Sequence, residues 1–260
     1  ISGFWDDCRR YGATAFPYIG ELPRYLLDAP PSARDRDHQV RSMVGVGLRG
    51  ALWAPLRERF GIEEIHEIYS ASEANLGFVN PFQIPGTVGF TPLPHALLAW
   101  DADAGEPRRG PDGRCVRVPR GVPGLLVGKV TARTAFDGYT DPAASEGKLL
   151  RDVFEPGDSW FNSGDLLQKV GWGHAIFVDR VGDTFRWRSE NVSTMQVEAA
   201  LREEPEVLDC AVYGVSVAGA PGRAGMATVV LRPGQRLAVA GLGARLRGRL
   251  PEPAVPVFLR

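Results

Sequence analysis

The sequence predicts an α/β fold that continues into a small α+β module. Three regions of different pattern along the 260 residues support this. Helix-like and strand-like segments alternate up to residue 69, short β-rich runs fill residues 86–180, and a hairpin followed by helices and strands comes after residue 182. Alternating strands and helices favour a largely parallel sheet, and closely spaced short strands favour a β-subdomain. We therefore expect two domains, residues 1–181 and 182–260.

The first region contains six predicted elements. Apolar residues at helical spacing predict the helices, and short apolar runs predict buried strands. Pro30-Pro31 ends the second helix. The predicted helices are Phe4–Tyr11, Glu21–Leu27 and Ala51–Phe60, and the predicted strands are Thr14–Ile19, Val40–Val46 and Ile65–Tyr69.

The second region is predicted to be built of short strands and turns. Clusters of Gly, Pro and Asp, such as Arg109-Gly-Pro-Asp-Gly113, separate the runs His95–Trp100, Cys115–Val118, Gly124–Val130 and Ala175–Val178. Two turns are predicted near its end, at Ser163-Gly164-Asp165 between two strand-like runs and at Val181-Gly182-Asp183.

The third region is predicted to be a compact module after a short aromatic-basic hairpin. Its predicted elements are a helix at Ser193–Glu203, strands near Val207–Val215 and Met226–Leu231, and a helix at Leu237–Leu250.

Composition excludes several classes of function. The formal net charge is -1, so no overall field attracts nucleic acid. Three widely spaced cysteines favour a reducing, cytoplasmic setting. No stretch approaches the roughly 20 apolar residues of a membrane span. The histidines show no metal-ligand spacing. Arginine greatly outnumbers lysine, as expected for a bacterium with a GC-rich genome.

The segment Val44–Gly50 contains the pattern G-x-G-x-x-G. Followed by a helix, this pattern is typical of a dinucleotide-binding turn. However, Arg41 and Ser42 occupy the preceding strand, where a central parallel strand is normally apolar. NAD binding therefore remains an alternative at this point.

The segment Ile68–Asn75 leaves a predicted strand and turns sharply. Tyr69 could stack on a base. Ser72 could donate to a phosphate, and Glu73 could hold Mg²⁺ through its carboxylate. Taken alone, this segment favours a helix N-cap at Ser72, because caps outnumber metal sites. At Asp165, a carboxylate could accept hydrogen bonds from both hydroxyls of a ribose, and Gly182 could act as a swivel.

Taken in order, these pieces resemble the adenylate-forming acyl-CoA synthetases, and more narrowly their fatty acid transport protein and very-long-chain acyl-CoA synthetase branch. The resemblance covers nearly the whole chain. It is carried by Tyr18-Ile-Gly-Glu-Leu-Pro-Arg-Tyr-Leu26, Asp35-Arg-Asp-His38, Gly47-Leu-Arg-Gly50, Phe161-Asn-Ser-Gly-Asp-Leu166 and Asp179-Arg-Val-Gly-Asp-Thr-Phe-Arg-Trp187. It implies the C-terminal portion of such an enzyme: an incomplete large adenylation domain followed by a small lid.

The resemblance implies a fatty-acyl-CoA synthetase that uses a long-chain fatty acid, ATP, Mg²⁺ and CoA. Fatty acid and ATP give an acyl-adenylate and pyrophosphate, and CoA then displaces AMP. The resemblance implies that Gly47, Leu48, Arg49 and Tyr69 bind adenine, that Ser72 and Glu73 bind the α-phosphate and Mg²⁺, and that Asp165 and Arg180 bind the ribose. It also implies a hinge at Gly182. The CoA tunnel would be lined by Arg188, Ser189, Glu190 and Asn191, and the acyl pocket by Tyr18 and Gly20.

The sequence also departs from the family pattern. The family's phosphate loop would precede residue 1, and the lid lysine that assists adenylation would follow Arg260. Ser72 replaces a usual Thr, and Ser189 replaces a usual Gly in the tunnel. Two alternatives therefore stay open beside the synthetase: a non-catalytic nucleotide-binding module, and a ligase that loads a carrier protein. Membrane association would involve segments outside this chain, and the oligomeric state is not predicted.

Overall fold

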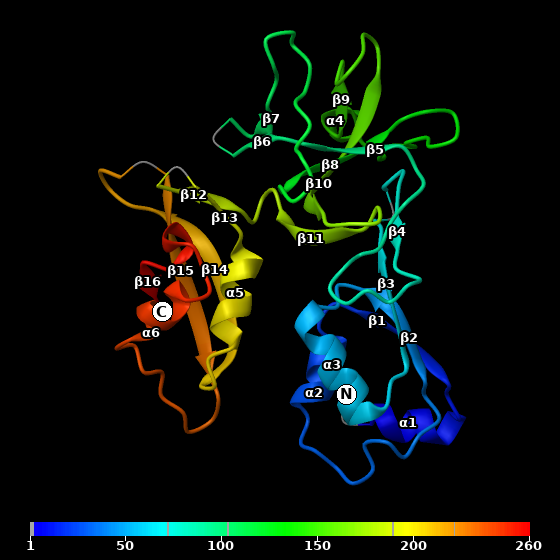
Figure 1. Ribbon diagram of the computed structural model, residues 1–260, viewed down its shortest axis with the longest axis vertical. Coiled ribbons are helices and arrows are strands. Elements are labelled where there is room, and N and C mark those ends of the chain that lie inside the picture. The colour runs from blue at the N-terminus through cyan, green and yellow to red at the C-terminus, as the bar shows by residue number, and fades with distance from the viewer. Residues whose placement is uncertain (1–2, 72, 103, 189, 221) are drawn as a thin grey trace. The chain divides into compact units, whose positions relative to one another are not determined.

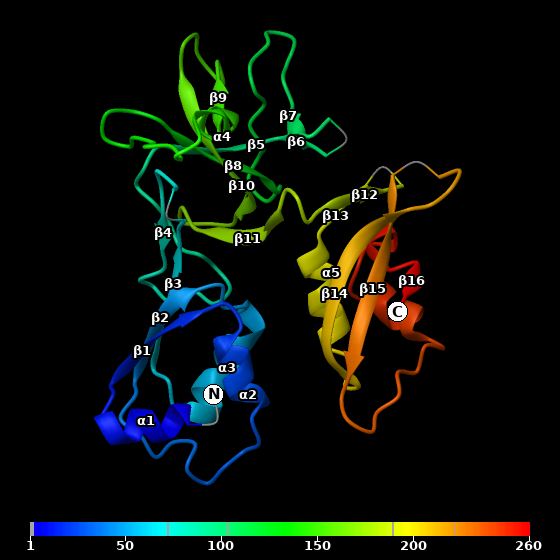
Figure 2. The same ribbon diagram turned by 180° about the vertical axis from the view of Figure 1, so that it is seen from behind.

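The computed structural model describes residues 3–71, 73–102, 104–188, 190–220 and 222–260, and Figures 1 and 2 show its elements from opposite sides. The chain folds as two compact units. Unit 1 comprises Ile1–His95, Val127–Asn162 and Gln168–Phe177, and unit 2 comprises Ala96–Leu126, Ser163–Leu167 and Val178–Arg260. The domain division at residue 181 remains a prediction.

Unit 1 contains the predicted parallel sheet. Its strand order is β1-β2-β3-β4, in which β1, β2 and β3 are parallel and the short β4 is antiparallel to β3. The strands are β1 Ala15–Ile19, β2 Ser42–Val46, β3 Glu64–Tyr69 and β4 Phe78–Val79. The helices between them are α1 Phe4–Tyr11, α2 Leu22–Asp28, the 3₁₀ helix η1 Gly50–Leu52 and α3 Trp53–Phe60. The three predicted helices and three predicted strands are thus confirmed.

One core joins these helices to the sheet. Alternate residues of β1 are buried and exposed, so one face of this strand packs inward. Helix α3 ends at Gly61, whose φ of 68° is the left-handed conformation that glycine adopts easily. The buried residues of this core are Cys8, Phe16, Tyr18, Leu26, Val40, Met43, Leu48, Trp53, Leu56, Phe60, Ile62 and Ile65.

A five-stranded sheet has the order β11-β10-β8-β5, with β9 also paired to β10. A two-stranded ribbon, β6-β7, and the helix α4 accompany it. The bounds are β5 His95–Leu98, β6 Trp100–Asp101, β7 Glu106–Pro107, β8 Gly124–Lys129, α4 Pro142–Gly147, β9 Leu149–Arg151, β10 Ser159–Lys169 and β11 Ala175–Arg180.

Two predictions for this region were wrong. Ser163-Gly164-Asp165 is not a turn, because β10 continues through all three residues. Gly164 adopts a φ of 78° there, which lets a strand bend without ending. Cys115–Val118 forms only isolated bridges, Leu98 to Arg117 and Arg109 to Cys115, and not a strand.

The C-terminal part of unit 2 is the predicted α+β module. The hairpin β12-β13 precedes α5, and β14, β15 and β16 form a three-stranded sheet. The predicted helix over Leu237–Leu250 was too long, because Gly241 has a φ of 83° and α6 starts only after it. The bounds are β12 Phe185–Trp187, β13 Glu190–Val192, α5 Thr194–Arg202, β14 Val207–Ser216, β15 Arg223–Leu231, α6 Leu242–Arg247, η2 Glu252–Ala254 and β16 Phe258–Leu259.

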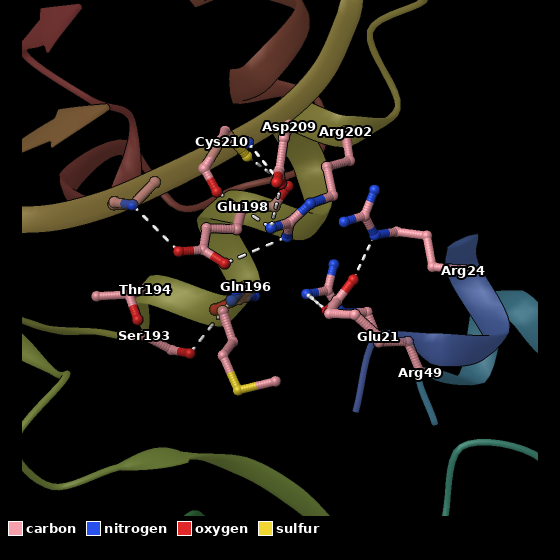
Figure 3. Close-up of polar contacts among 12 residues, drawn as sticks. Glu21, Arg24, Arg49, Ser193, Thr194, Gln196, Glu198, Arg202, Asp209 and Cys210 are labelled. Atoms are coloured by element: carbon pink, nitrogen blue, oxygen red, sulfur yellow. Dashed lines mark hydrogen bonds and ion pairs between the residues drawn. The ribbon is translucent and has the colours of Figure 1, made fainter. Parts of the chain in front are cut away.

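Ion pairs tie α5 to the adjacent strand. The guanidinium of Arg202 lies 3.2 Å from Glu198 and 3.1 Å from Asp209, and Figure 3 shows it between the two carboxylates. The other oxygen of Glu198 accepts from the backbone N–H of Val212 at 3.1 Å. These contacts hold the helix in register with β14. The described residues include no helix with the length and apolar character needed to cross a membrane.

Ser193 is the N-cap of α5, as the predicted start of the helix requires. Its hydroxyl oxygen accepts from the N–H of Gln196 and donates to Asp179, which is 1% exposed. We expect Ser193→Ala to lower the free energy of unfolding by about 1 to 2 kcal/mol, because a cap and a contact to a buried carboxylate are both lost. Urea unfolding of both proteins measures this change. A difference below about 0.5 kcal/mol would contradict the capping role.

Candidate functional site

Three predicted site segments follow the three parallel strands at their carboxyl ends. Gly20 follows β1, Gly47–Arg49 follows β2, and Tyr69 is the last residue of β3. The Cα of Gly20 lies 3.4 Å from where a Cβ of Gly47 would be, and Gly47 has a φ of 85°. Ligands of open α/β sheets bind outside this edge. Unit 1 therefore places the predicted adenine-binding segments where such a sheet offers a ligand site.

Glu67 holds this edge together, and it is not among the site residues predicted from the sequence. The residue is 3% exposed. Its carboxylate accepts from the N–H of Gly47 at 2.6 Å and from the N–H of Leu48 at 3.2 Å. The hydroxyl of Tyr18 donates to the same carboxylate. The sequence signal that could have pointed to it is an acidic residue inside the predicted strand Ile65–Tyr69.

Burial changes the proton equilibria of this pair. Burial raises the pKa of Glu67 to about 7, although hydrogen bonds from Tyr18, Gly47 and Leu48 counteract the effect. Burial and the neighbouring carboxylate also raise the pKa of Tyr18. Tyr18 is 1% exposed, so this predicted acyl-pocket residue is part of the core and engages Glu67.

The same contacts argue against the dinucleotide interpretation of Gly45–Gly50. In such a turn, backbone N–H groups after the strand would point at a pyrophosphate. Here the N–H groups of Gly47 and Leu48 already donate to a carboxylate. The negative charge of a pyrophosphate would also be repelled by Glu67 when it is ionised.

Arg49 is tied to the loop after β1. Its guanidinium lies 2.8 Å from Glu21, which also pairs with Arg24, and Arg24 reaches Asp28 at 2.9 Å. Figure 3 shows Arg24, Glu21 and Arg49 grouped in this way. The ion pair orders the end of the segment Gly47–Arg49 relative to α2.

Tyr69 has an aromatic environment within unit 1. Its ring centroid lies 5.8 Å from that of Phe78 in an edge-to-face arrangement and 6.3 Å from that of Phe177. The side chain is half-buried. An aromatic ring held in this way offers a surface on which a base could stack.

Glu73 lies in unit 1, and its Oε1 accepts from the hydroxyl of Tyr139 at 3.3 Å. Burial, together with the Glu73 carboxylate, raises the pKa of Tyr139, so this hydroxyl stays protonated and donates. The described residues include no group of three or more potential metal ligands. A single carboxylate nevertheless fits Mg²⁺ bound mainly by phosphate and water. Ser72 lies outside the described residues.

Asn75, two residues after Glu73, is hydrogen-bonded to the segment Lys129–Thr134. Its Nδ2 donates to the carbonyls of Lys129 and Thr134 at 3.0 and 3.1 Å. The hydroxyl of Thr134 donates in turn to the carbonyl of Lys129. These bonds limit the freedom of the segment that carries Glu73.

Asp165 and Arg180 lie together within unit 2. The Nε of Arg180 is 3.6 Å from Oδ1 of Asp165, and the side chains are 73% and 14% exposed. The backbone N–H of Val181 donates to the carbonyl of Gly164 at 2.9 Å, so the ends of these two strand segments are joined. A shielded carboxylate beside an accessible cation suits a diol next to a phosphate.

Gly182 lies in a turn, as predicted. The N–H of Asp183 donates to the carbonyl of Arg180 at 3.0 Å. A Cβ at Gly182 would meet no atom within 4 Å, and its φ is not positive. Neither space nor backbone conformation requires glycine here in this structure.

The predicted tunnel residues form the hairpin β12-β13. Trp187 pairs with Glu190, and Arg186 pairs with Asn191. Arg188 has a φ of 49°, and its guanidinium lies 5.8 Å from the centroid of the Trp187 ring, within the range of a cation–π contact. Ser189 lies outside the described residues.

Phe185 anchors this hairpin on two opposed glycines. Gly214 and Gly225 face each other on β14 and β15. A Cβ at Gly214 would lie 2.6 Å from Cβ of Phe185, and one at Gly225 would lie 3.2 Å from its Cζ. The absence of side chains at both positions makes room for the ring, which is 4% exposed.

Comparison with known sequences gives consistent matches. Residues 196–260 match the family described as AMP-binding enzyme C-terminal domain. The chain is 50% identical over 259 residues to a medium/long-chain-fatty-acid–CoA ligase of Mycobacterium tuberculosis, covering 100% of this chain and 43% of that protein. It is 44% identical to human long-chain fatty acid transport protein 3, covering 99% of this chain and 39% of that protein.

Solved structures share the fold at low sequence identity. The amide bond synthetase McbA of Marinactinospora thermotolerans matches with a TM-score of 0.74 and 23% identity, covering 100% of this chain and 51% of that one. The O-succinylbenzoate coenzyme A synthetase of Bacillus subtilis, in complex with AMP, matches with a TM-score of 0.72 and 18% identity, covering 99% and 49%. The chain thus spans less than half the length of the ligase and the transport protein and about half the length of the two solved structures.

Proposed function

Because this chain is homologous along its whole length to fatty-acid–CoA ligases and fatty acid transport proteins and has the fold of the adenylate-forming enzymes, we propose that it is part of a fatty-acyl-CoA synthetase. The whole protein would join a long-chain fatty acid to CoA through an acyl-adenylate. The observation that carries the proposal is the 50% identity to a fatty-acid–CoA ligase across the chain. The substrates would be the fatty acid, ATP and CoA.

Unit 1 would recognise the base. Tyr69 would stack on adenine, and the backbone of Gly47–Arg49 would form another wall of the pocket. The ordered edge of the parallel sheet supports this proposal, because Glu67 and Glu21 fix the two ends of that segment. Tyr18, on β1, and the half-buried Gly20 that follows this strand would contribute to the acyl pocket.

Ser72 and Glu73 would act at the phosphates. The hydroxyl of Ser72 would donate to the α-phosphate, and the carboxylate of Glu73 would hold Mg²⁺. When bound, the ion neutralises the negative charge that gathers on the phosphates during adenylation. The hydroxyl of Tyr139 keeps the Glu73 carboxylate oriented through its 3.3 Å hydrogen bond.

Asp165 and Arg180 would bind the sugar. The two oxygens of Asp165 would accept from the ribose hydroxyls, and Arg180 would donate to ribose or phosphate. Their separation of 3.6 Å supports the pairing. The division into residues 1–181 and 182–260 would let a lid rotate at Gly182 between the two half-reactions.

The hairpin residues Arg188, Ser189, Glu190 and Asn191 would line the passage for CoA after this rotation. Glu190 and Asn191 are exposed, and the hairpin is held by Phe185. Any peripheral contact with a membrane would come from segments outside these residues.

The proposal is tested by titrating the chain with a non-hydrolysable acyl-sulfamoyl adenosine while following its melting temperature. Ligand at about 100 times its dissociation constant should add roughly 2.7 kcal/mol to the free energy of unfolding. We expect a clear rise in melting temperature with this compound, a smaller rise with AMP and none with NAD. A rise with NAD alone would support the dinucleotide interpretation. No rise with any compound would contradict nucleotide binding by this chain.

A further inference from the structure

We infer that Glu67 is a positioning residue, whose buried carboxylate fixes the backbone of Gly47 and Leu48 in the shape that receives adenine. This inference rests on the proposed function, since it assigns a support to the segment proposed as an adenine wall. Glu67 itself would not touch the nucleotide, because it is 3% exposed.

The contacts of Glu67 join three consecutive strands of the parallel sheet. Glu67 lies on β3, the two N–H donors follow β2, and the hydroxyl donor of Tyr18 lies on β1. Oε1 accepts from Gly47 at 2.6 Å and from Leu48 at 3.2 Å, while Oε2 accepts from Leu48 at 3.3 Å and from Tyr18. One carboxylate on β3 thus bonds to β1 and to the segment that follows β2.

Among the described residues, these two N–H groups have no acceptor other than Glu67. The segment cannot be held from within, because Gly47 has no side chain and adopts a φ of 85°. Leu48 is buried and anchors only the apolar side of the segment. Removal of the acceptor would leave the buried N–H of Leu48 unsatisfied, which is costly, and would deprive the N–H of the exposed Gly47 of its acceptor in the protein.

The groups that face Glu67 explain why an acidic residue fits without an ion pair. Tyr18 faces it from β1, and two backbone N–H dipoles face it from the end of β2. No lysine or arginine among the described residues forms an ion pair with it. The interaction is therefore directional hydrogen bonding at a defined place, which positions a backbone better than a charge pair would.

Substitutions that keep or remove the acceptor separate positioning from general stability. Glu67→Gln keeps an oxygen for Gly47 and Leu48, and its amide can donate to the oxygen of Tyr18. Glu67→Leu fills the same space without an acceptor. Glu67→Asp withdraws the carboxylate by one methylene and serves if the leucine variant does not fold. Glu64→Leu, at an exposed position of the same strand, is the matched control.

The first measurement is hydrogen exchange at the amides of Gly47 and Leu48, followed by NMR, with the amide of Val44 in β2 as reference. We expect slow exchange in the wild type, in Glu67→Gln and in Glu64→Leu. In Glu67→Leu or Glu67→Asp, exchange at both amides should be at least about tenfold faster, while Val44 is unchanged. Equal exchange at Gly47 and Leu48 in all variants would overturn the inference. This readout does not depend on nucleotide binding.

The second measurement is the affinity of each variant for AMP and for GMP. We expect Glu67→Leu to lose at least about tenfold in AMP affinity and to bind the two nucleotides more equally, whereas Glu67→Gln keeps the wild-type ratio. If the wild type binds AMP and the ratio is unchanged in Glu67→Leu, the positioning role is wrong and the proposed function stands. If the wild type binds neither nucleotide while exchange responds as expected, the proposed function fails and Glu67 supports only the fold.

Discussion

Between about pH 5 and pH 8, the wild-type chain is expected to lose about 2 to 3 kcal/mol of its free energy of unfolding relative to Glu67→Gln. Burial raises the pKa of Glu67 from 4.5 to about 7 in the folded chain. The folded state therefore binds this proton more strongly than the unfolded state. Glu67 contributes fully to stability below its unfolded pKa, and this contribution is lost as the pH rises through 7.

The measurement is urea unfolding of both proteins at several pH values, without ligand. Gln cannot titrate, so the difference between the two proteins isolates Glu67 from other acidic groups. Glu64→Gln, at an exposed position of the same strand, should follow the wild type at every pH. A constant difference between the wild type and Glu67→Gln, or a wild type that gains stability relative to the variant with rising pH, would contradict a raised pKa.

The second large effect concerns Asp165. We expect Asp165→Ala to weaken binding of the acyl-sulfamoyl adenosine by at least about 100-fold, because two hydrogen bonds from ribose hydroxyls to a charged acceptor are lost. The side chain is only 14% exposed, which strengthens such bonds by limiting competition from water. Isothermal titration calorimetry with the purified variants measures the change directly.

Asp183→Asn is the matched control for this loss. Asp183 is exposed and lies in the turn after Arg180, within the same unit. We expect its affinity to remain within about threefold of the wild type, because exposed single charges contribute little. Equal losses at Asp165 and Asp183 would indicate a general electrostatic effect. An unchanged affinity in Asp165→Ala would remove Asp165 from the proposed ribose site.

The elements between residues 4 and 69 could be predicted because their local signals agree. Apolar spacing, Pro30-Pro31 after α2 and glycine after α3 all point to the observed helices and strands. The turn predicted within β10 and the early start predicted for α6 were wrong, because a glycine in the sequence does not reveal whether the surrounding element continues through it. Gly164 bends a continuous strand, whereas Gly241 delays a helix.

The candidate site could likewise be predicted only in part from the sequence. Tyr69, Asp165 and Arg180 could be named from their motifs, and the structure places Asp165 beside Arg180. Glu67 could not be named, because nothing adjacent to it in the chain is its partner. Its donors lie 19, 20 and 49 positions away.

The sequence alone determined the order of helices and strands up to residue 69, the resemblance to acyl-CoA synthetases and the residue types available for binding a nucleotide. These follow from side-chain periodicity and from short motifs, which are local properties of the chain. Only the tertiary structure decided that Tyr18, Gly47, Leu48 and Glu67 meet. The physical reason is that parallel strands bring distant segments to one edge. Burial at that edge then gives a carboxylate its hydrogen-bond partners and its raised pKa.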